Sequence, residues 1–291
     1  MRSLTRRQWI AGSLLLGASA VGANAFAIEP RRVSVTRHSV GSGGTGRARR
    51  IVQLSDLHLQ DVGAHEDRVA CAVAALAPDL VVMTGDSIDD AGHVDLLGEF
   101  LSLLDTGTQK VAILGNWEHW ARVDLAHLAR TYERHGCRLL RNETVLLHLD
   151  GRELLVSGLD DLVGGAPDLA DTLRGVPPHP DHLVLAHCPA HRDLMQRELA
   201  SMRADASDTT GASNTMGAML PRCVLSGHTH GGQIALFGWA PVRPRGSGPY
   251  VAGWYDGEIP LYVSRGIGTT MIPARFGAPP EVALFEWTTA S

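Results

Sequence analysis

The sequence predicts an α/β fold in which the strands of a sheet are joined by crossover helices. Short apolar runs end in polar residues, and each of the first three runs is followed by a stretch with helical spacing. This alternation is typical of sheets with crossover helices. The predicted strands are residues 51–54, 80–83 and 111–114, and the predicted helices are residues 67–76, 94–104 and 123–134.

The second half of the chain is richer in predicted strands, and a helix is expected after Pro189. Residues 201–220 are rich in Ser, Ala, Thr, Gly and Asp and lack a period, which predicts a mobile surface insertion. The remaining predicted strands are residues 33–36, 145–149, 154–157, 183–186, 223–226, 233–236, 261–263 and 282–285.

Length and charge narrow the class of protein. The chain has 291 residues, a formal net charge of −5 and a pI near 6.3. Nucleic-acid binders usually carry a basic stripe, so we expect no nucleic-acid partner. The four cysteines form no CxxC pair, which argues against a cysteine zinc site. We expect Cys71 and Cys137 to be buried free thiols, and leave a disulfide between other cysteines open.

The first residues resemble an export signal. Arg6 and Arg7 precede an apolar run over residues 10–27, which ends in small residues suited to cleavage. A paired arginine before a modest apolar run is typical of a twin-arginine leader, so we expect export by that machinery, to the periplasm or to a membrane-associated position facing outside the cytoplasm. An ordinary signal peptide or an uncleaved anchor is the alternative, and export of an Arg6→Lys/Arg7→Lys variant tests between them. We therefore divide the chain into a leader (1–27), a lead-in segment (28–49) and one domain (50–291).

Polar residues follow five of the predicted strands. In open α/β sheets, ligands collect beyond the carboxyl ends of the strands. Carboxylate, imidazole and amide groups without a thiolate suit Zn, Mn, Fe or Mg. Glycines at 85, 115 and 227 precede several of these residues, which fits tight turns or close backbone approach. The seven candidate metal ligands are Asp56, His58, Asp86, Asn116, His187, His228 and His230.

This set of groups has a chemical rationale. A phosphate ester resists attack because its oxygens are already negative. Two cations about 3.5–4 Å apart can neutralise that charge and hold a hydroxide between them. Asp-x-His and His-x-His pairs at strand ends place both side chains of each pair toward the same side, where a metal can meet them. No separate organic cofactor site is predicted.

The ordered motifs resemble the calcineurin-like metallophosphoesterase family over roughly residues 50–287. The segments 227–233 and 262–268 are similar to its YaeI/YkuE-like branch of bacterial membrane-associated phosphodiesterases. The resemblance implies a four-layer αββα sandwich of two mixed sheets flanked by helices. The matching motifs are Asp56-Leu57-His58, Gly85-Asp86, Gly115-Asn116, His187 and Gly227-His228-Thr229-His230.

The resemblance also implies which residue holds which metal. Asp86 bridges two divalent ions in the family pattern. Asn116 and Asp86 also count as catalytic residues by this resemblance. One ion is assigned to Asp56, His58, Asp86 and His230, and the other to Asp86, Asn116, His187 and His228.

The third motif departs from the family, which usually has a histidine after the asparagine. Trp117 stands there, and indole donates no useful proton at neutral pH. We hypothesise that His119 takes over as acid or phosphate contact, and a packing role for His119 is the equal alternative. Arg265 and Arg275 either meet a substrate phosphate or lie on the surface.

Aromatic residues gather in the loops expected around the site. Their amphipathic rings suit a lipid interface or an apolar substrate tail, and they equally suit a loop core. The branch resemblance favours a lipid-linked substrate and a membrane-surface association. The residues are Trp117, Trp120, Phe237, Trp239, Tyr250 and Trp254.

The predicted function is a two-metal phosphoesterase that hydrolyses a phosphodiester or pyrophosphate by in-line attack of a metal-bridging hydroxide. The substrate is expected to be a small molecule or a lipid, including a nucleotide-sugar lipid. Two alternatives remain at this point. One is a phosphomonoesterase or nucleotidase, and the other is a catalytically silent metal-bearing binding protein.

Overall fold

Two mixed β-sheets of six strands each form the centre of the molecule, as expected. The computed structural model describes residues 5–41, 47–210 and 220–288. The first sheet has the order β1-β12-β2-β3-β4-β5, and strands β2 to β5 are parallel. Its strands are β1 (Ser34–Val40), β2 (Arg49–Leu54), β3 (Leu80–Thr84), β4 (Gln109–Ile113), β5 (Cys137–Leu139) and β12 (Glu281–Trp287).

The second sheet has the order β10-β11-β9-β8-β7-β6. Its central strands β11, β9, β8 and β7 are parallel, and the two outer strands are antiparallel to their neighbours. Its strands are β6 (Glu143–Leu149), β7 (Arg152–Gly158), β8 (His182–Leu185), β9 (Cys223–Ser226), β10 (Gly253–Tyr255) and β11 (Leu261–Val263).

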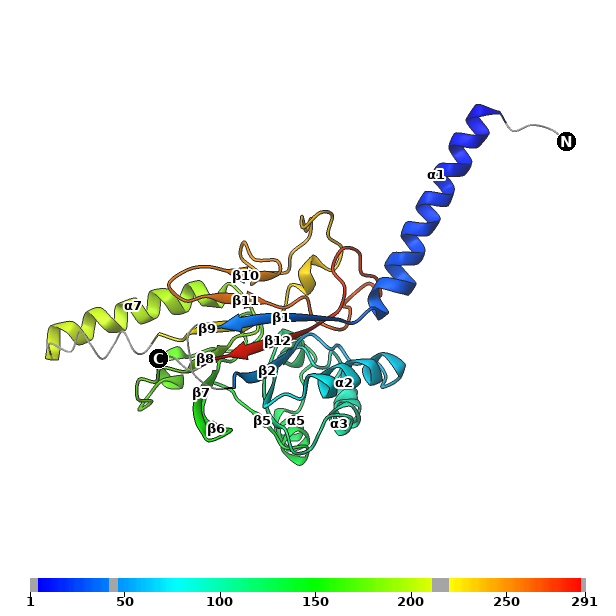
Figure 1. Cartoon of the computed structure of the whole chain (residues 1–291). Helices are drawn as coiled ribbons and strands as arrows, with labels where there is room; N and C mark the ends of the chain where they lie inside the picture. Colours follow the sequence, from blue (N-terminus) through cyan, green and yellow to red (C-terminus); the bar gives the residue numbers. More distant parts are fainter. Residues whose placement is uncertain (1–4, 42–46, 211–219, 289–291) are drawn as a thin grey trace.

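Helices cover the outer faces of the two sheets (Figure 1). α2, α3 and α5 lie on the first sheet, and α7 lies beside the second, which gives the four layers expected. α1 projects away from the body of the molecule. The helices are α1 (Arg6–Ala23), α2 (Ala64–Leu76), α3 (Val94–Ser102), α4 (Asn116–Trp120), α5 (Leu125–Arg134), α6 (Leu169–Thr172) and α7 (His191–Thr210).

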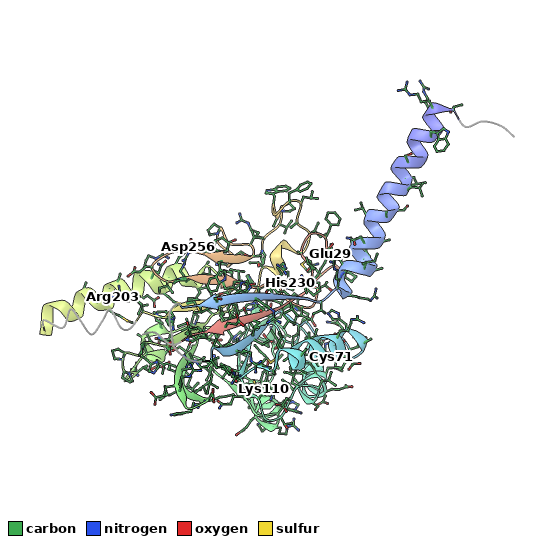
Figure 2. All side chains as sticks on the ribbon, in the orientation of Figure 1. Glu29, Cys71, Lys110, Arg203, His230 and Asp256 are labelled. Carbon is green, nitrogen blue, oxygen red and sulfur yellow. The ribbon has the colours of Figure 1, made fainter. Side chains whose placement is uncertain are left out.

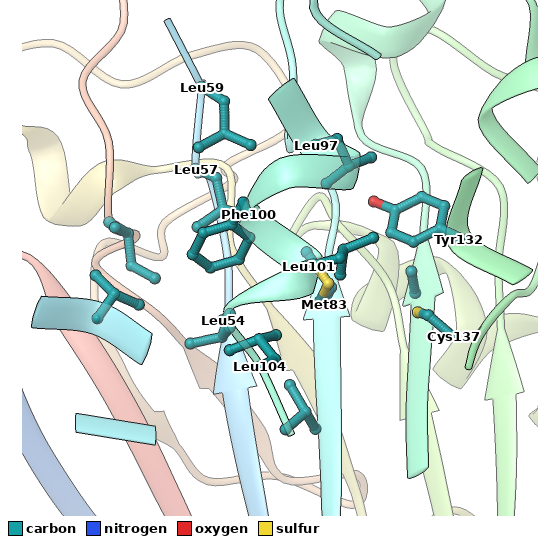
Figure 3. Close-up of a cluster of buried hydrophobic side chains, with 14 of the residues drawn as sticks. Leu54, Leu57, Leu59, Met83, Leu97, Phe100, Leu101, Leu104, Tyr132 and Cys137 are labelled. Carbon is teal, nitrogen blue, oxygen red and sulfur yellow. The ribbon is translucent and has the colours of Figure 1, made fainter. Parts of the chain in front are cut away.

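Three hydrophobic clusters hold these layers together. One lies between α2, α3, α5 and the first sheet, one between the sheets, and one between the second sheet and α7. In α3, the spacing of Leu97, Phe100 and Leu101 places these side chains on one face, where they pack toward Leu54 and Met83 (Figure 3). The strands thus sit between apolar layers, and their carboxyl ends are left to carry polar groups.

Several sequence-based predictions need correction. Residues 233–236 form no strand, because they are tied to the 270–276 loop and show only two isolated bridges, from Ile234 to Phe276 and from Leu236 to Trp239. β1 lies in the lead-in segment and pairs with β12 over seven residues, so that part belongs to the sheet. Cys71 is exposed rather than buried, whereas Cys137 is buried as expected. All four cysteines lie within the described residues and are free thiols.

The two remaining segments are the predicted insertion and the leader. α7 continues to Thr210, and residues 211–219 lie outside the described residues, so the mobility of 201–220 stays a prediction. α1 spans most of the apolar run. Within the described ranges, no helix combines the length and apolarity that crossing a membrane requires.

The buried His182 of β8 predicts a pH dependence of stability. Burial lowers the pKa of His182 to about 4, and its Nε2 lies 2.8 Å from Ser157 Oγ. An unfolded histidine titrates near 6.5, so between pH 6.5 and 4 the unfolded chain binds a proton that the folded chain does not. Stability should therefore fall as pH falls through this window, with about 3 kcal/mol from this group.

The His182→Gln variant should lose that part of the pH dependence, whatever its stability at neutral pH. Urea unfolding at a series of pH values measures the slope for the variant and the unchanged chain. His148→Gln is the matched control, because His148 is an exposed histidine of the same sheet. Equal slopes for all three proteins would contradict the assignment.

Candidate metal centre

The seven predicted ligands converge at the carboxyl ends of strands from both sheets. β2 leads to Asp56 and β3 to Asp86, while β8 and β9 of the other sheet lead to His187 and His228. All seven side chains belong to buried residues. The site therefore lies where the ends of the two sheets meet, although its members are up to 174 residues apart in the chain (Asp56 to His230).

Six of these residues form two groups that could each hold a metal ion. The ligand atoms of Asp56, His58 and His230 all lie within 4.8 Å of one another, and so do those of a second group. In the first group, His58 Nε2 is 3.1 Å from His230 Nε2, and His230 Nε2 is 3.5 Å from Asp56 Oδ1. The family resemblance assigned these three residues to one ion, together with Asp86 as the bridging ligand.

The second group contains Asp86, His187 and His228. His187 Nε2 lies 3.1 Å from Asp86 Oδ2 and 3.2 Å from His228 Nδ1. Asn116 Oδ1 is 3.2 Å from His187 Nε2, so the amide joins this group.

Asp86 lies between the two groups. Its Oδ2 is 3.1 Å from His187 Nε2 and 3.7 Å from His58 Nε2, so one oxygen faces a member of each group. Its Oδ1 accepts a hydrogen bond of 2.9 Å from the backbone N–H of Trp117, which fixes the orientation of the carboxylate. The arrangement suits a carboxylate shared by two ions.

The backbone of the ligand loops is strained. Asp56, His58, Asp86, His228 and His230 all have φ between 44° and 72°. Side-chain-bearing residues rarely adopt this left-handed region, and its use concentrates at functional sites. Backbone bonds hold the strained loops together, including Asp56 N–H to Gly85 O and His58 N–H to Asp86 O, both at 3.0 Å.

Two glycines permit the close approach that the sequence suggested. A Cβ on Gly115 would lie 2.2 Å from Asp86 Oδ1, and a Cβ on Gly227 would lie 2.3 Å from Asp56 Oδ2. Both positions therefore exclude a side chain because the carboxylates of the site occupy the space.

Neighbouring groups orient the imidazoles. His187 Nδ1 lies 2.7 Å from Thr84 O, and His228 Nε2 lies 2.8 Å from Arg245 O. Each ring therefore donates from one nitrogen to a carbonyl and directs the lone pair of the other nitrogen toward the site. His58 Nδ1 lies 3.8 Å from a carboxylate oxygen of Asp89, which is too far for a hydrogen bond, and it has no hydrogen-bond partner among the described residues.

Burial shapes the charges of the site. Burial raises the pKa of Asp56. Burial also raises the pKa of Asp86, but the adjacent His187, with a smaller contribution from His58, outweighs it and holds the pKa below its usual value. Burial lowers the pKa of His230 well below its usual value, and the nearby His58 and Arg275 add to this effect. Burial lowers the pKa of His187, but Asp86 and Asp56 outweigh it and raise that pKa well above its usual value. His230 is therefore held neutral as a metal ligand needs, whereas metal binding at His187 displaces a proton.

The residues present fit divalent metal ions. Ring nitrogens face each other at 3.1 Å in one group and 3.2 Å in the other, and two opposed lone pairs at such distances call for a shared cation or proton. Buried carboxylates likewise call for a positive partner. The centre therefore holds two candidate metal sites, built from oxygen and imidazole ligands that suit the expected ions.

Glu118 is a structural residue of the site that the sequence reasoning did not assign. Its buried carboxylate accepts hydrogen bonds from the N–H groups of Gly115 (2.9 Å), Asp86 (3.2 Å), Ser87 (2.6 Å) and Ile88 (3.4 Å). One side chain thus joins the loop after β4 to the loop after β3. The sequence did contain a signal for this role, because a glutamate three residues after the N-cap of a helix is typical of a capping box.

The structure places His119 against Asp160. His119 Nε2 lies 2.7 Å from Asp160 Oδ1, and this hydrogen bond raises the pKa of the imidazole. Asp160 also accepts from Arg141 Nε at 2.8 Å. His119 is not among the residues that line the cavity at the metal centre.

That cavity opens beside the metal centre and has a volume of about 610 Å³. Asp86, Asn116, His228 and His230 form its polar end, and Arg245 is the one Lys or Arg in its lining. The indole rings of Trp117 and Trp120 pack edge to face with their centroids 5.5 Å apart. The apolar part of the wall includes Trp117, Trp120, Ile234, Val242, Met271 and Ile272.

Other expectations about this region are corrected by the structure. Arg275 is fully buried and donates to the carbonyls of Gly268 and Ala278, so it is neither a phosphate contact nor a surface residue. Arg265 pairs with Glu281 at 3.1 Å. Tyr250 is buried and Trp254, which is 37% exposed, packs edge to face against Tyr262; neither lines the cavity.

Comparison with known proteins agrees with this geometry. A sequence model described as calcineurin-like phosphoesterase matches residues 49–232. The chain is similar to the uncharacterized metallophosphoesterase YkuE of Bacillus subtilis, at 32% identity over 98% of each protein. It is similar to an uncharacterized metallophosphoesterase of Aquifex aeolicus, at 30% identity over 81% of this chain and 83% of the relative. It also resembles the phosphodiesterase YaeI of Escherichia coli, at 27% identity over 81% of each protein.

The Glu118 contacts predict a loss of both stability and metal binding in Glu118→Gln. The amide replaces one acceptor oxygen with a donor that faces backbone N–H groups, and each unsatisfied buried group costs about 1–3 kcal/mol. Urea unfolding in the presence of a chelator measures stability, and elemental analysis measures the metal content after reconstitution.

Glu66→Gln is the matched control for this experiment. Glu66 makes the corresponding capping contact to Gly63 N–H at 3.0 Å at the start of α2, away from the metal centre. It should cost less stability and leave the metal content unchanged. If Glu118→Gln retains a full complement of metal, the two loops do not depend on this side chain.

Proposed function

The chain belongs to the calcineurin-like phosphoesterase family, a family of metal-dependent hydrolases of phosphoester bonds, and from this premise we propose that it hydrolyses a phosphodiester that carries an apolar group. The proposal rests on one observation. The candidate metal ligands and an apolar surface of Trp117, Trp120 and Val242 line the same cavity. A phosphoryl group at the ligands would place its substituent on this surface.

The charge of the cavity supports a diester over a monoester. A phosphomonoester carries up to two negative charges, and its sites commonly gather several cationic donors. Arg245 is the one Lys or Arg in this lining. A diester carries a single charge and two organic groups, which suits one cation and an extended apolar wall. The similarity to YaeI, which is named as a phosphodiesterase, agrees with this interpretation.

The residues of the chain have distinct tasks in this reaction. When bound, two divalent ions neutralise phosphate charge and lower the pKa of bound water. Asp86 is placed to be shared between the two ligand groups, and Trp117 N–H fixes its orientation. Thr84 O and Arg245 O hold the rings of His187 and His228 in place. The apolar wall excludes water from the substituent side of the site.

Asp86→Asn tests the proposed reaction directly. The amide offers one acceptor oxygen and no charge, so cleavage of bis-p-nitrophenyl phosphate with added Mn should fall by more than about 100-fold, beyond the usual effect of groups that only orient ligands. Asp90→Asn, an exposed carboxylate four residues later, is the control and should retain activity. Preference for p-nitrophenyl phosphate would favour a phosphomonoesterase or nucleotidase, and metal binding without cleavage of either compound would favour a binding protein.

His119→Ala decides whether this histidine acts as a general acid. Acid catalysis typically contributes about 10²–10⁴-fold, most for poor leaving groups. Because His119 binds Asp160 and does not line the cavity, we expect a loss of less than about 10-fold on alkyl and aryl diesters alike. A loss above 100-fold that is confined to poor leaving groups would restore the hypothesis of an acid role.

A further inference from the structure

An apolar surface with arginines at its edge surrounds the mouth of the cavity. In residues 233–245, Phe237 is fully exposed, Val242 is 75% exposed and Trp239 is 65% exposed. Large apolar side chains at such exposure are costly in water when they are contiguous, and contiguous patches usually mark an interaction site. We name this surface the apolar rim, and it comprises Phe26, Ile28, Ile234, Leu236, Phe237, Trp239, Val242, Met271 and Ile272.

The three segments of the apolar rim are held together by hydrogen bonds. Gln233 Nε2 donates to Thr270 O and Ile272 O, and Gln233 Oε1 accepts from Thr270 N–H. Arg275 N–H donates to Ala25 O at 2.8 Å, which attaches the segment carrying Phe26 and Ile28. Glu29 of this segment, labelled in Figure 2, accepts a hydrogen bond from Ala278 N–H at 2.8 Å. The rim is therefore one fixed surface and not three independent loops.

The charges near the rim indicate which kind of surface it contacts. The chain as a whole has a net charge of −5, yet residues 233–245 and 266–278 contain no Asp or Glu. The exposed arginines at the rim are Arg31, Arg32, Arg243 and Arg245. The carboxylate in the N-terminal segment, Glu29, is occupied by Ala278 N–H and Asn24 Nδ2. Exposed Trp and Phe together with arginines suit the interface of an anionic bilayer.

We propose that the apolar rim docks on the surface of an anionic lipid bilayer, with Phe237 and Trp239 inserted among the lipids. Ile234, Val242, Met271 and Ile272 belong both to the rim and to the cavity wall, so docking turns the cavity toward the membrane. An amphiphilic phosphoester could then enter the cavity from the bilayer without crossing water. The docking does not depend on turnover, so it stands or falls separately from the proposed reaction.

A fluorescent label at the loop tip tests the docking. Phe237→Cys is labelled with nitrobenzoxadiazole on a Cys71→Ser background, because Cys71 is the exposed cysteine and the other three are buried. Leu146→Cys is the matched control, since Leu146 is 42% exposed on β6, outside the rim. We expect vesicles of phosphatidylcholine with phosphatidylglycerol to shift the emission of the label at 237 to the blue, and to leave the label at 146 unchanged.

Two further variants separate the contributions of the rim. Phe237→Ser/Trp239→Ser in the full chain should reduce vesicle flotation several-fold, whereas Leu103→Ser/Leu146→Ser should not. Arg32→Gln/Arg243→Gln should lose the preference for anionic over neutral vesicles, and high salt should have the same effect on the unchanged chain.

Two outcomes would overturn the proposal. If the label at 237 stays in water while the chain floats with vesicles, another part such as α1 holds the membrane. If the label shifts without vesicles as protein concentration rises, and light scattering shows a larger species, a second copy of the chain covers the rim. Activity on soluble bis-p-nitrophenyl phosphate, measured in parallel, shows whether the proposed reaction survives independently.

Discussion

The position of the Asp86 carboxylate is the constraint on which the metal centre depends. One of its oxygens faces His187 of the second sheet and His58 of the first, and the other accepts the N–H of Trp117. The two sheets must therefore end at the same place, with β3 and β8 in fixed relation. The apolar cluster between the sheets supplies that relation, because it packs their inner faces together directly behind the ligand loops.

The strained backbone of the ligand loops follows from the same constraint. A strand would direct His228 and His230 to one face because they are two residues apart, yet they belong to different ligand groups, so the chain turns sharply after the strand ends. Left-handed conformations at Asp56, Asp86 and His228 provide this turn. Such conformations persist only when the surroundings hold them, and Glu118 does so for Asp86 by accepting hydrogen bonds from four backbone N–H groups in the loops after β3 and β4.

Much of the fold and all seven candidate ligands could be predicted because their signals are local in the sequence. An apolar run followed by a His-x-His pair predicts both the strand β9 and the candidate ligands after it. The contact of His119 with Asp160 could not be predicted, because 41 residues separate them and no pattern relates them. The prediction for Arg275 was wrong for a similar reason. The carbonyls that accept hydrogen bonds from its guanidinium come together only in the folded loop. Residues 233–236 alternate like a strand, but Gln233 ties them to the 270–276 loop instead.

The candidate ligands and much of the cavity wall come from different parts of the chain. The candidate ligands all lie within the segment that matches the family, residues 49–232, whereas Ile234, Val242 and Met271 of the cavity wall lie beyond it. The ligands come from strand ends fixed by three hydrophobic clusters, and the wall comes from loops with exposed apolar side chains. Loops can change without disturbing the sheets behind them. Under the proposed function, the substituent of the phosphodiester is therefore selected by the loops after residue 232 together with Trp117 and Trp120 of α4, while the geometry of the ligands stays the same.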